Sequence, residues 1–72
     1  MKSDVIEINS EKVSGTPVFA GTRVPIKNLF DYLEGGETVE DFLEGFPPVS
    51  REQAVAVLKM AEKSLIKEVS SI

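Results

Sequence analysis

The chain has 72 residues and a net charge of −4, and its 42% hydrophobic and 28% charged residues are typical of a globular domain. It contains neither cysteine nor histidine, which excludes disulfides, cysteine-based zinc sites and histidine bases, and we expect no metal and no cofactor. A chain of this length buries only about 60% of its unfolded surface. Because such a core is marginal, we expect a homodimer.

The charge is distributed unevenly along the chain. Residues 1–27 carry four basic and three acidic side chains, whereas residues 28–72 carry four basic and nine acidic ones. Nucleic-acid affinity comes largely from neutralising phosphates, so this balance argues against strong DNA binding by the chain alone. No apolar run approaches the roughly 20 residues of a membrane span, and the first ten residues do not resemble a signal peptide. We therefore expect a cytoplasmic protein that does not enter a membrane.

Short strands are predicted in the N-terminal third of the chain. Ile6 and Ile8 alternate with an acidic residue and are expected to share the buried face of one strand over 5–8. A turn signal then precedes a second β-like run over 16–20. Strands this short do not form a stable sheet alone, so the β-hairpin arm, residues 1–24, is expected to pack on helices or on a second copy.

Helical spacing begins at Pro25, which suits the first turn of a helix because its missing N–H is not needed there. Gly35-Gly36 ends this helix, since glycine adopts the left-handed C-terminal conformation freely. Thr38 caps a second helix, with Asp41 as the acid of a capping box. Pro47-Pro48 then stops the second helix.

Ser50 and Gln53 form a full capping box at the start of the third and longest helix. The chain is therefore predicted to be a single domain, residues 1–72, of mainly α class: a short N-terminal β-hairpin followed by a three-helix core over 25–68. The short bend before the third helix matches a trihelical helix-turn-helix plan. The inward face of the third helix is expected to hold Ala54, Val57, Leu58, Ala61 and Leu65.

The start of the third helix supplies two candidates for DNA contact. Arg51 and Gln53 lie where a recognition helix presents base-reading side chains, and both types bond well in the major groove. The capping box explains Gln53 equally well, and Arg51 has Glu44 and Glu52 nearby as ion-pair partners.

Lysines recur at every fourth position along the third helix, and they are further candidates for DNA contact. Lys59, Lys63 and Lys67 form one stripe, which suits either a phosphate-contacting ridge or an ordinary solvated face. The acids Glu62 and Glu68 lie near them in the sequence and favour the solvated face.

No catalytic residue is predicted. The chain has no histidine base and no thiol, no serine has a base beside it, and Gly35-Gly36 lacks the further glycines and lysine of a phosphate loop. Carboxylates are plentiful, but all lie at predicted helix caps or exposed positions where nothing is expected to shift their pKa. We therefore expect a binding protein and not an enzyme.

Residues 15–26 read Gly-Thr-Pro-Val-Phe-Ala-Gly-Thr-Arg-Val-Pro-Ile. This run closely resembles the opening signature of the domain-of-unknown-function family 433, in which a glycine and a proline precede an apolar pair and Gly-Thr-Arg. Phe46-Pro47 and the polar start of the third helix agree as well, and the resemblance covers about residues 5–65. It implies a homeodomain-like or winged helix-turn-helix fold and a bacterial or archaeal source.

Many members of this family look like VapB-type antitoxins. Such antitoxins bind and silence a PIN-like ribonuclease toxin, and often repress their own operon as dimers on operator DNA. The resemblance therefore implies an antitoxin, with a stand-alone DNA-binding transcriptional regulator and an adaptor without DNA binding as alternatives. We expect dimerisation through the N-terminal strands, because the edge of the predicted hairpin is exposed.

Thr22 and Arg23 are the candidate partner-binding residues within the signature. A guanidinium recognises carboxylates through two parallel hydrogen bonds, so Arg23 suits the acidic metal site of a PIN-like nuclease. The structural alternative is that Arg23 joins the hairpin to the first helix by bonding backbone carbonyls or Asp31. Gly21 would then merely allow a tight approach.

Overall fold

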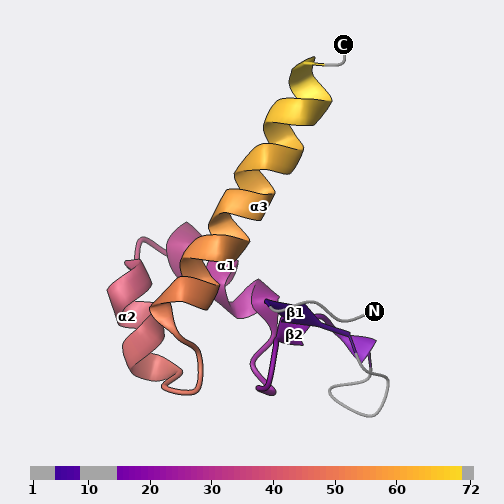
Figure 1. The fold of residues 1–72 in the computed structure, drawn as a ribbon. Helices are drawn as coiled ribbons and strands as arrows, with labels where there is room; N and C mark the ends of the chain where they lie inside the picture. The colour runs from indigo at the N-terminus through magenta and orange to yellow at the C-terminus, as the bar shows by residue number, and fades with distance from the viewer. Residues whose placement is uncertain (1–4, 9–14, 71–72) are drawn as a thin grey trace.

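The computed structural model describes residues 5–8 and 15–70, with side chains as far as Glu68. Two short strands, β1 (Ile6–Glu7) and β2 (Val18–Phe19), are followed by three helices: α1 (Ile26–Glu34), α2 (Val39–Gly45) and α3 (Arg51–Ser70). The predicted fold class, a short hairpin followed by three helices, is confirmed. In Figure 1, α1 and α2 lie beside the first turns of α3, the hairpin lies on the side away from α2, and the rest of α3 runs away from the body.

The hairpin is antiparallel and is continued by the segment before α1. Ile6 lies opposite Phe19 and Glu7 opposite Val18, so the two strands pair over their whole length. On its other side β2 is bridged through Val18 to Pro25. β2 therefore has backbone neighbours on both sides and is fixed in place although it is only two residues long.

The first strand departs from its prediction in one respect. Ile6 is half-buried against the core, but Ile8 is 43% exposed, so the expected shared buried face of these residues is wrong. The strand ends at Glu7, and the alternation of faces ends with it. The same chain segment therefore anchors the hairpin through one isoleucine only.

The helix boundaries follow the predicted sequence signals closely. Pro25 directly precedes α1 with an extended backbone, one position earlier than the expected place inside the first turn. Just beyond the end of α1, Gly36 adopts a φ of +89°. This is the left-handed conformation for which the Gly35-Gly36 pair was predicted to end the helix. The capping box of α2 is formed: Thr38 Oγ1 accepts from the Asp41 N–H at 3.1 Å, and an Asp41 carboxylate oxygen accepts from the Thr38 N–H at 3.0 Å.

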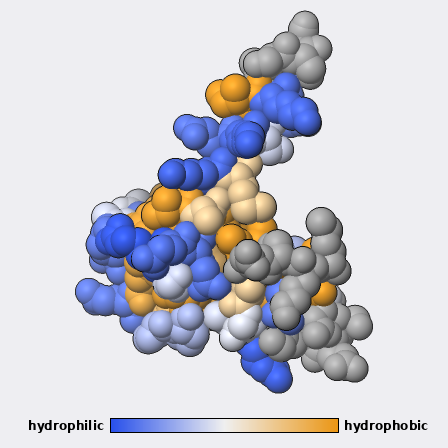
Figure 2. All heavy atoms as spheres, viewed as in Figure 1, coloured by the Kyte–Doolittle hydropathy of each residue, from blue (hydrophilic) through white to orange (hydrophobic). Residues whose placement is uncertain are grey.

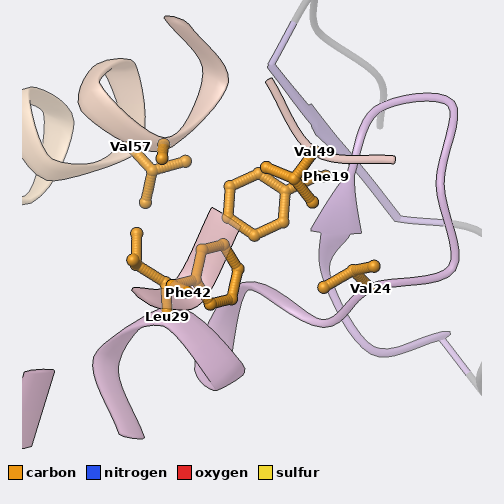
Figure 3. Packing of buried hydrophobic residues seen from close by; sticks show 7 residues of the cluster. Phe19, Val24, Leu29, Phe42, Val49 and Val57 are labelled. Atoms are coloured by element: carbon orange, nitrogen blue, oxygen red, sulfur yellow. The ribbon is translucent and has the colours of Figure 1, made fainter. Parts of the chain in front are cut away.

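The core lies where the three helices and β2 meet, and aromatic rings fill it. Phe19 and Phe42 are fully buried, with ring centroids 5.7 Å apart, and Figure 3 shows them at the centre of the buried cluster. Tyr32 and Phe46 extend this group in edge-on contact, with centroids 5.8 Å apart. Each large buried side chain contributes roughly 1.5–3 kcal/mol through removal of apolar surface from water, so these rings hold α1 and α2 to β2.

α3 leaves the core about halfway along its length. Ala54 and Val57 are 0% and 3% exposed, and Leu58 and Ala61 are half-buried, as predicted for the inward face. The prediction is wrong at Leu65, which is 62% exposed. The reason is length, because α3 has 20 residues whereas α1 has 9 and α2 has 7. The shorter helices cannot flank the whole of α3.

Candidate functional site

The residues from Phe19 to Val24, here called the GTR loop, form a tight turn after β2. The Thr22 N–H donates to the Phe19 carbonyl at 3.0 Å, which places Gly21 third in the turn with a φ of +77°. A residue with a side chain is strained at that φ. No atom lies within 4 Å of the position that a Cβ of Gly21 would take. Gly21 is therefore required by backbone conformation, and the expectation of a close approach is wrong.

Thr22 is an internal brace of the GTR loop. Its side chain is 7% exposed, and its hydroxyl donates to the Phe19 carbonyl at 2.7 Å while it accepts from the Val24 N–H at 3.0 Å. A further backbone bond joins the Phe19 N–H to the Val24 carbonyl at 3.0 Å. The Thr22 hydroxyl is thus occupied within the loop, and these bonds fix the shape of the loop.

Arg23 is the charged side chain that the GTR loop presents to solvent. Its neighbours Thr22 and Val24 both point inward, so the alternation of an extended chain directs Arg23 outward. Arg23 makes no hydrogen bond or ion pair with any residue in the described ranges 5–8 and 15–70. The expected alternative of a bond to Asp31 is wrong, because Asp31 binds the Lys27 ammonium at 2.9 and 3.0 Å.

Gln53 ties the GTR loop to the start of α3. Its side-chain oxygen accepts from the Ser50 N–H at 3.0 Å, and its own N–H donates to the Ser50 hydroxyl at 3.1 Å, which confirms the predicted capping box. Its side-chain amide also donates to the Ala20 carbonyl at 2.9 Å. The bond joins residues 33 positions apart in the sequence. It was not predicted, because no pattern of neighbouring residues indicates a contact over that separation. Gln53 is therefore half-buried and engaged, although it was a candidate for reading bases.

The GTR loop is also fixed from the side of the hairpin. The Ala20 N–H donates to the Val5 carbonyl at 2.8 Å, and the Gly21 N–H donates to a Glu7 carboxylate oxygen at 3.2 Å. Together with Gln53, these bonds hold the loop between β1 and α3. The loop is consequently part of the folded body and presents Arg23 from a defined position.

Arg51 joins α3 to α2 through an ion pair with Glu40. The prediction of Glu44 or Glu52 as the ion-pair partner of Arg51 is wrong. The fold places α2 beside the first turn of α3, so that Glu40 of α2 lies next to the Arg51 guanidinium. The pair is exposed on both sides, so it orients the two helices more than it stabilises them. Arg51 keeps exposed surface but its guanidinium already has an anionic partner.

Glu40 and Asp41 have lowered pKa values, against the expectation that no carboxyl group would shift. The hydrogen bond from Arg51 is the main cause that lowers the pKa of Glu40. Bonds from the backbone and the hydroxyl of Thr38 lower the pKa of Asp41 at the start of α2. Both shifts favour the ionised form, so neither group becomes a proton donor near neutral pH.

The candidate DNA-contacting residues do not form one free surface. Arg51 and Gln53 are engaged at the start of α3, whereas Lys59 and Lys63 are exposed farther along, where α3 leaves the core. Figure 2 shows this outer part of α3 with hydrophilic and hydrophobic residues side by side, standing clear of the body. The two groups therefore belong to different regions of the molecule.

The structure also bears on metals and membranes. In the described ranges, no cluster of carboxylates is arranged so that it could hold a metal ion. No helix within those ranges has both the length and the apolar content that a membrane crossing needs. The described residues do provide a fixed loop with the exposed Arg23, a capped start of α3 and exposed lysines on the outer part of α3.

Comparison with known proteins places the chain in a family. No curated protein and no solved structure matches it. Residues 6–61 match the family described as protein of unknown function (DUF433), a range that holds the hairpin, α1, α2 and the first half of α3. Because this match covers most of the 72 residues, the chain belongs to the DUF433 family.

Proposed function

We propose that this protein is an antitoxin-like binding module of the cytoplasm that neutralises a PIN-like ribonuclease partner through the GTR loop. The observation that carries the proposal is Arg23: an exposed guanidinium, without a partner in the described ranges, on a loop fixed on both sides. The acidic metal site of a PIN-like nuclease offers carboxylates that match a guanidinium in charge and geometry.

The rigidity of the GTR loop supports a binding role. A partner that docks on a mobile loop must order it, and each immobilised side chain or segment weakens the net affinity. Here the backbone on both sides of Arg23 is already held by the Thr22 hydroxyl and by Gln53. Binding through Arg23 would therefore require ordering of its side chain but little ordering of the loop backbone.

The charge around the helix-turn-helix weakens the claim of operator binding. α2 begins with Glu40 and Asp41 in its first turn, where a DNA-bound motif approaches phosphates. Arg51, which would neutralise phosphate there, is paired with Glu40. Repression of its own operon is therefore secondary in this proposal and depends on positive charge from a bound partner.

The test is inhibition of a PIN-like ribonuclease encoded in the adjacent reading frame, measured by cleavage of an RNA substrate while the antitoxin is titrated. Arg23→Ala is expected to lose inhibition, and Arg23→Lys to retain only part of it, since an ammonium cannot bond a carboxylate with a planar fork. Arg51→Ala is the matched control, because it removes an exposed arginine that already has a partner.

Equal inhibition by wild type and Arg23→Ala would contradict the role of Arg23. Absence of any inhibition by the wild-type chain would contradict the antitoxin function itself. A mobility-shift assay on the upstream promoter at two salt concentrations, with and without the nuclease, separates the remaining alternatives. A salt-dependent shift by the chain alone would support the stand-alone regulator, and no shift under any condition would leave the chain without DNA binding.

A further inference from the structure

The outer part of α3 carries a face that combines lysines with exposed apolar side chains. Ile66 shares one shallow hollow with Lys59, Lys63 and Lys67, and Glu62 also borders it. Met60 shares the adjoining hollow with Lys63 and Lys67. Ile66 is 62% exposed and Met60 47%. These residues, Lys59, Met60, Lys63, Ile66 and Lys67, are here called the strut face.

A groove of complementary character lies between the hairpin and α1. Its apolar lining comes from Ile6, Pro17, Ile26 and Phe30, and Asp31 and Glu34 line it toward the C-terminal end of α1. Lys27 lines it as well, but its ammonium is paired with Asp31. Among the described residues that line this hairpin groove, Glu34 is the carboxylate that has no ion pair of its own.

The C-terminal end of α1 lacks a cation. The helix dipole places partial negative charge on the last carbonyls, where a basic side chain is favourable and an acidic one is not. α1 has no basic residue in its last turn and ends with Glu34. Residues 26–45 hold six acidic residues and one lysine, so α1 and α2 provide little positive charge of their own.

We propose that the strut face of one copy docks into the hairpin groove of a second copy, and that the contact is reciprocal. Ile66 would enter the apolar lining near Phe30, and the flanking lysines would meet Glu34 and the C-terminal end of α1. This is the binding of an amphipathic helix in a groove. α3 of the same chain runs away from the body and cannot fill its own groove (Figure 1).

Charge and composition favour a second copy over other occupants. The chain is acidic overall, and the strut face offers three lysines and no arginine, which is little for phosphate recognition. Its apolar members would stay exposed against nucleic acid, whereas the hairpin groove supplies apolar lining and negative charge together. Residues beyond 61 lie outside the family match, so this proposal concerns the present chain and does not depend on the antitoxin function proposed above.

The decisive comparison uses two neighbouring residues that are equally exposed. Leu65 and Ile66 are each 62% exposed, yet consecutive residues point about 100° apart around a helix, and only Ile66 lies on the strut face. Sedimentation equilibrium of the full chain measures the dimer dissociation constant. Ile66→Ser is expected to raise the dimer dissociation constant at least tenfold, because each of the two contacts loses one buried apolar side chain. Leu65→Ser is expected to leave it unchanged.

Charge exchange provides a second test of the same contact. Lys63→Glu and Glu34→Lys should each weaken the dimer, and an equimolar mixture of the two variants should associate like wild type, since both contacts in the mixed dimer regain opposite charges. Glu44→Lys is the control, because it makes the same charge change outside the groove. Thermal unfolding separates folding from association: Glu34→Lys should not destabilise the monomer, because it places a cation at the end of α1.

Several outcomes would overturn the proposal. A wild-type chain that stays monomeric at tens of micromolar excludes it. A larger effect from Leu65→Ser than from Ile66→Ser would indicate pairing of α3 with α3 instead, and a dimer insensitive to both would indicate the predicted pairing of N-terminal strands. Failure of the charge-exchanged mixture to regain association would also contradict it.

Discussion

The two halves of α3 carry apolar residues on the same helix face but lie in different surroundings. In the first half, Ala54 and Val57 are packed against rings from β2 and α2, and Gln53 and Arg51 are bonded to other elements. In the second half, Leu65 continues the same helix face and is 62% exposed. Apolar spacing therefore predicts which face of a helix is apolar, but the lengths of the neighbouring helices decide whether that face is covered.

Polar residues also differ between the body of the molecule and its exposed parts. Thr22 and Gln53 lie in the body and have their hydrogen-bonding groups occupied by backbone atoms, so their loss acts on folding. Arg23 and Lys63 are exposed, and the two proposals place them in binding surfaces, so their substitution is expected to affect binding. Substitution of Thr22 or Gln53 should therefore lower the free energy of unfolding, whereas substitution of Arg23 or Lys63 should change binding and leave that free energy nearly unchanged.

The largest effect is expected in the aromatic core. Phe42→Ala should lower the free energy of unfolding by about 3–5 kcal/mol, because Phe42 is fully buried between Phe19, Tyr32 and Phe46. Leu65→Ala in the outer half of α3 should change it by less than about 0.5 kcal/mol. Urea unfolding followed by circular dichroism measures both. Comparable losses would mean that Leu65 is covered in solution.

A smaller but sharper effect is expected at the hydroxyl of Thr22. Thr22→Val keeps the shape and leaves the Val24 N–H without its acceptor, which should cost about 1–3 kcal/mol. Thr22→Ser keeps the hydroxyl and removes only a methyl group, which should cost about 0.8 kcal/mol. The difference between the two variants in chemical unfolding isolates the hydrogen bonds. Equal losses would show that Thr22 matters for packing alone.

Next in size is the backbone strain that Gly21 avoids. Gly21→Ala should destabilise by about 1–2 kcal/mol, since an L-residue is disfavoured at its φ of +77° although space is open around it. Gly35→Ala is the control at a φ of −82°, where alanine is accepted without strain. Thermal unfolding of both variants is the measurement, and a neutral Gly21→Ala would refute the conformational requirement.

The smallest effect is electrostatic and concerns the joint between α2 and α3. The pKa of Glu40 lies below its ordinary value of 4.5 in the folded chain, so the stabilisation is present above pH 4.5 and is lost as the pH falls through the lowered value. Arg51→Ala removes the main cause and should raise the pKa of Glu40 toward 4.5. NMR titration of the carboxyl carbons tests this.

Asp41 provides the internal control for that titration. Its pKa is lowered by Thr38 and should stay low in Arg51→Ala. If both carboxyl groups shifted together, the change would reflect disruption of α2 and not the loss of the ion pair.

The sequence predicted the local features of the fold well. Both capping boxes, the glycine stop after α1 and the order of the elements follow from signals within a few residues, and all are present. Glu40 as the partner of Arg51 and the bond from Gln53 to Ala20 were missed, because each joins segments whose proximity arises only from packing. Arg23 was a candidate from the signature, and its exposure on a braced loop is what the fold adds.

The two bonds of the Gln53 side chain connect the GTR loop to α3, which matters for any partner that binds the loop. One amide group both caps α3 and holds the Ala20 carbonyl, so displacing the loop strains the first turn of the long helix as well. A partner that moves the GTR loop would therefore also disturb the start of α3, a helix of 20 residues and about 30 Å.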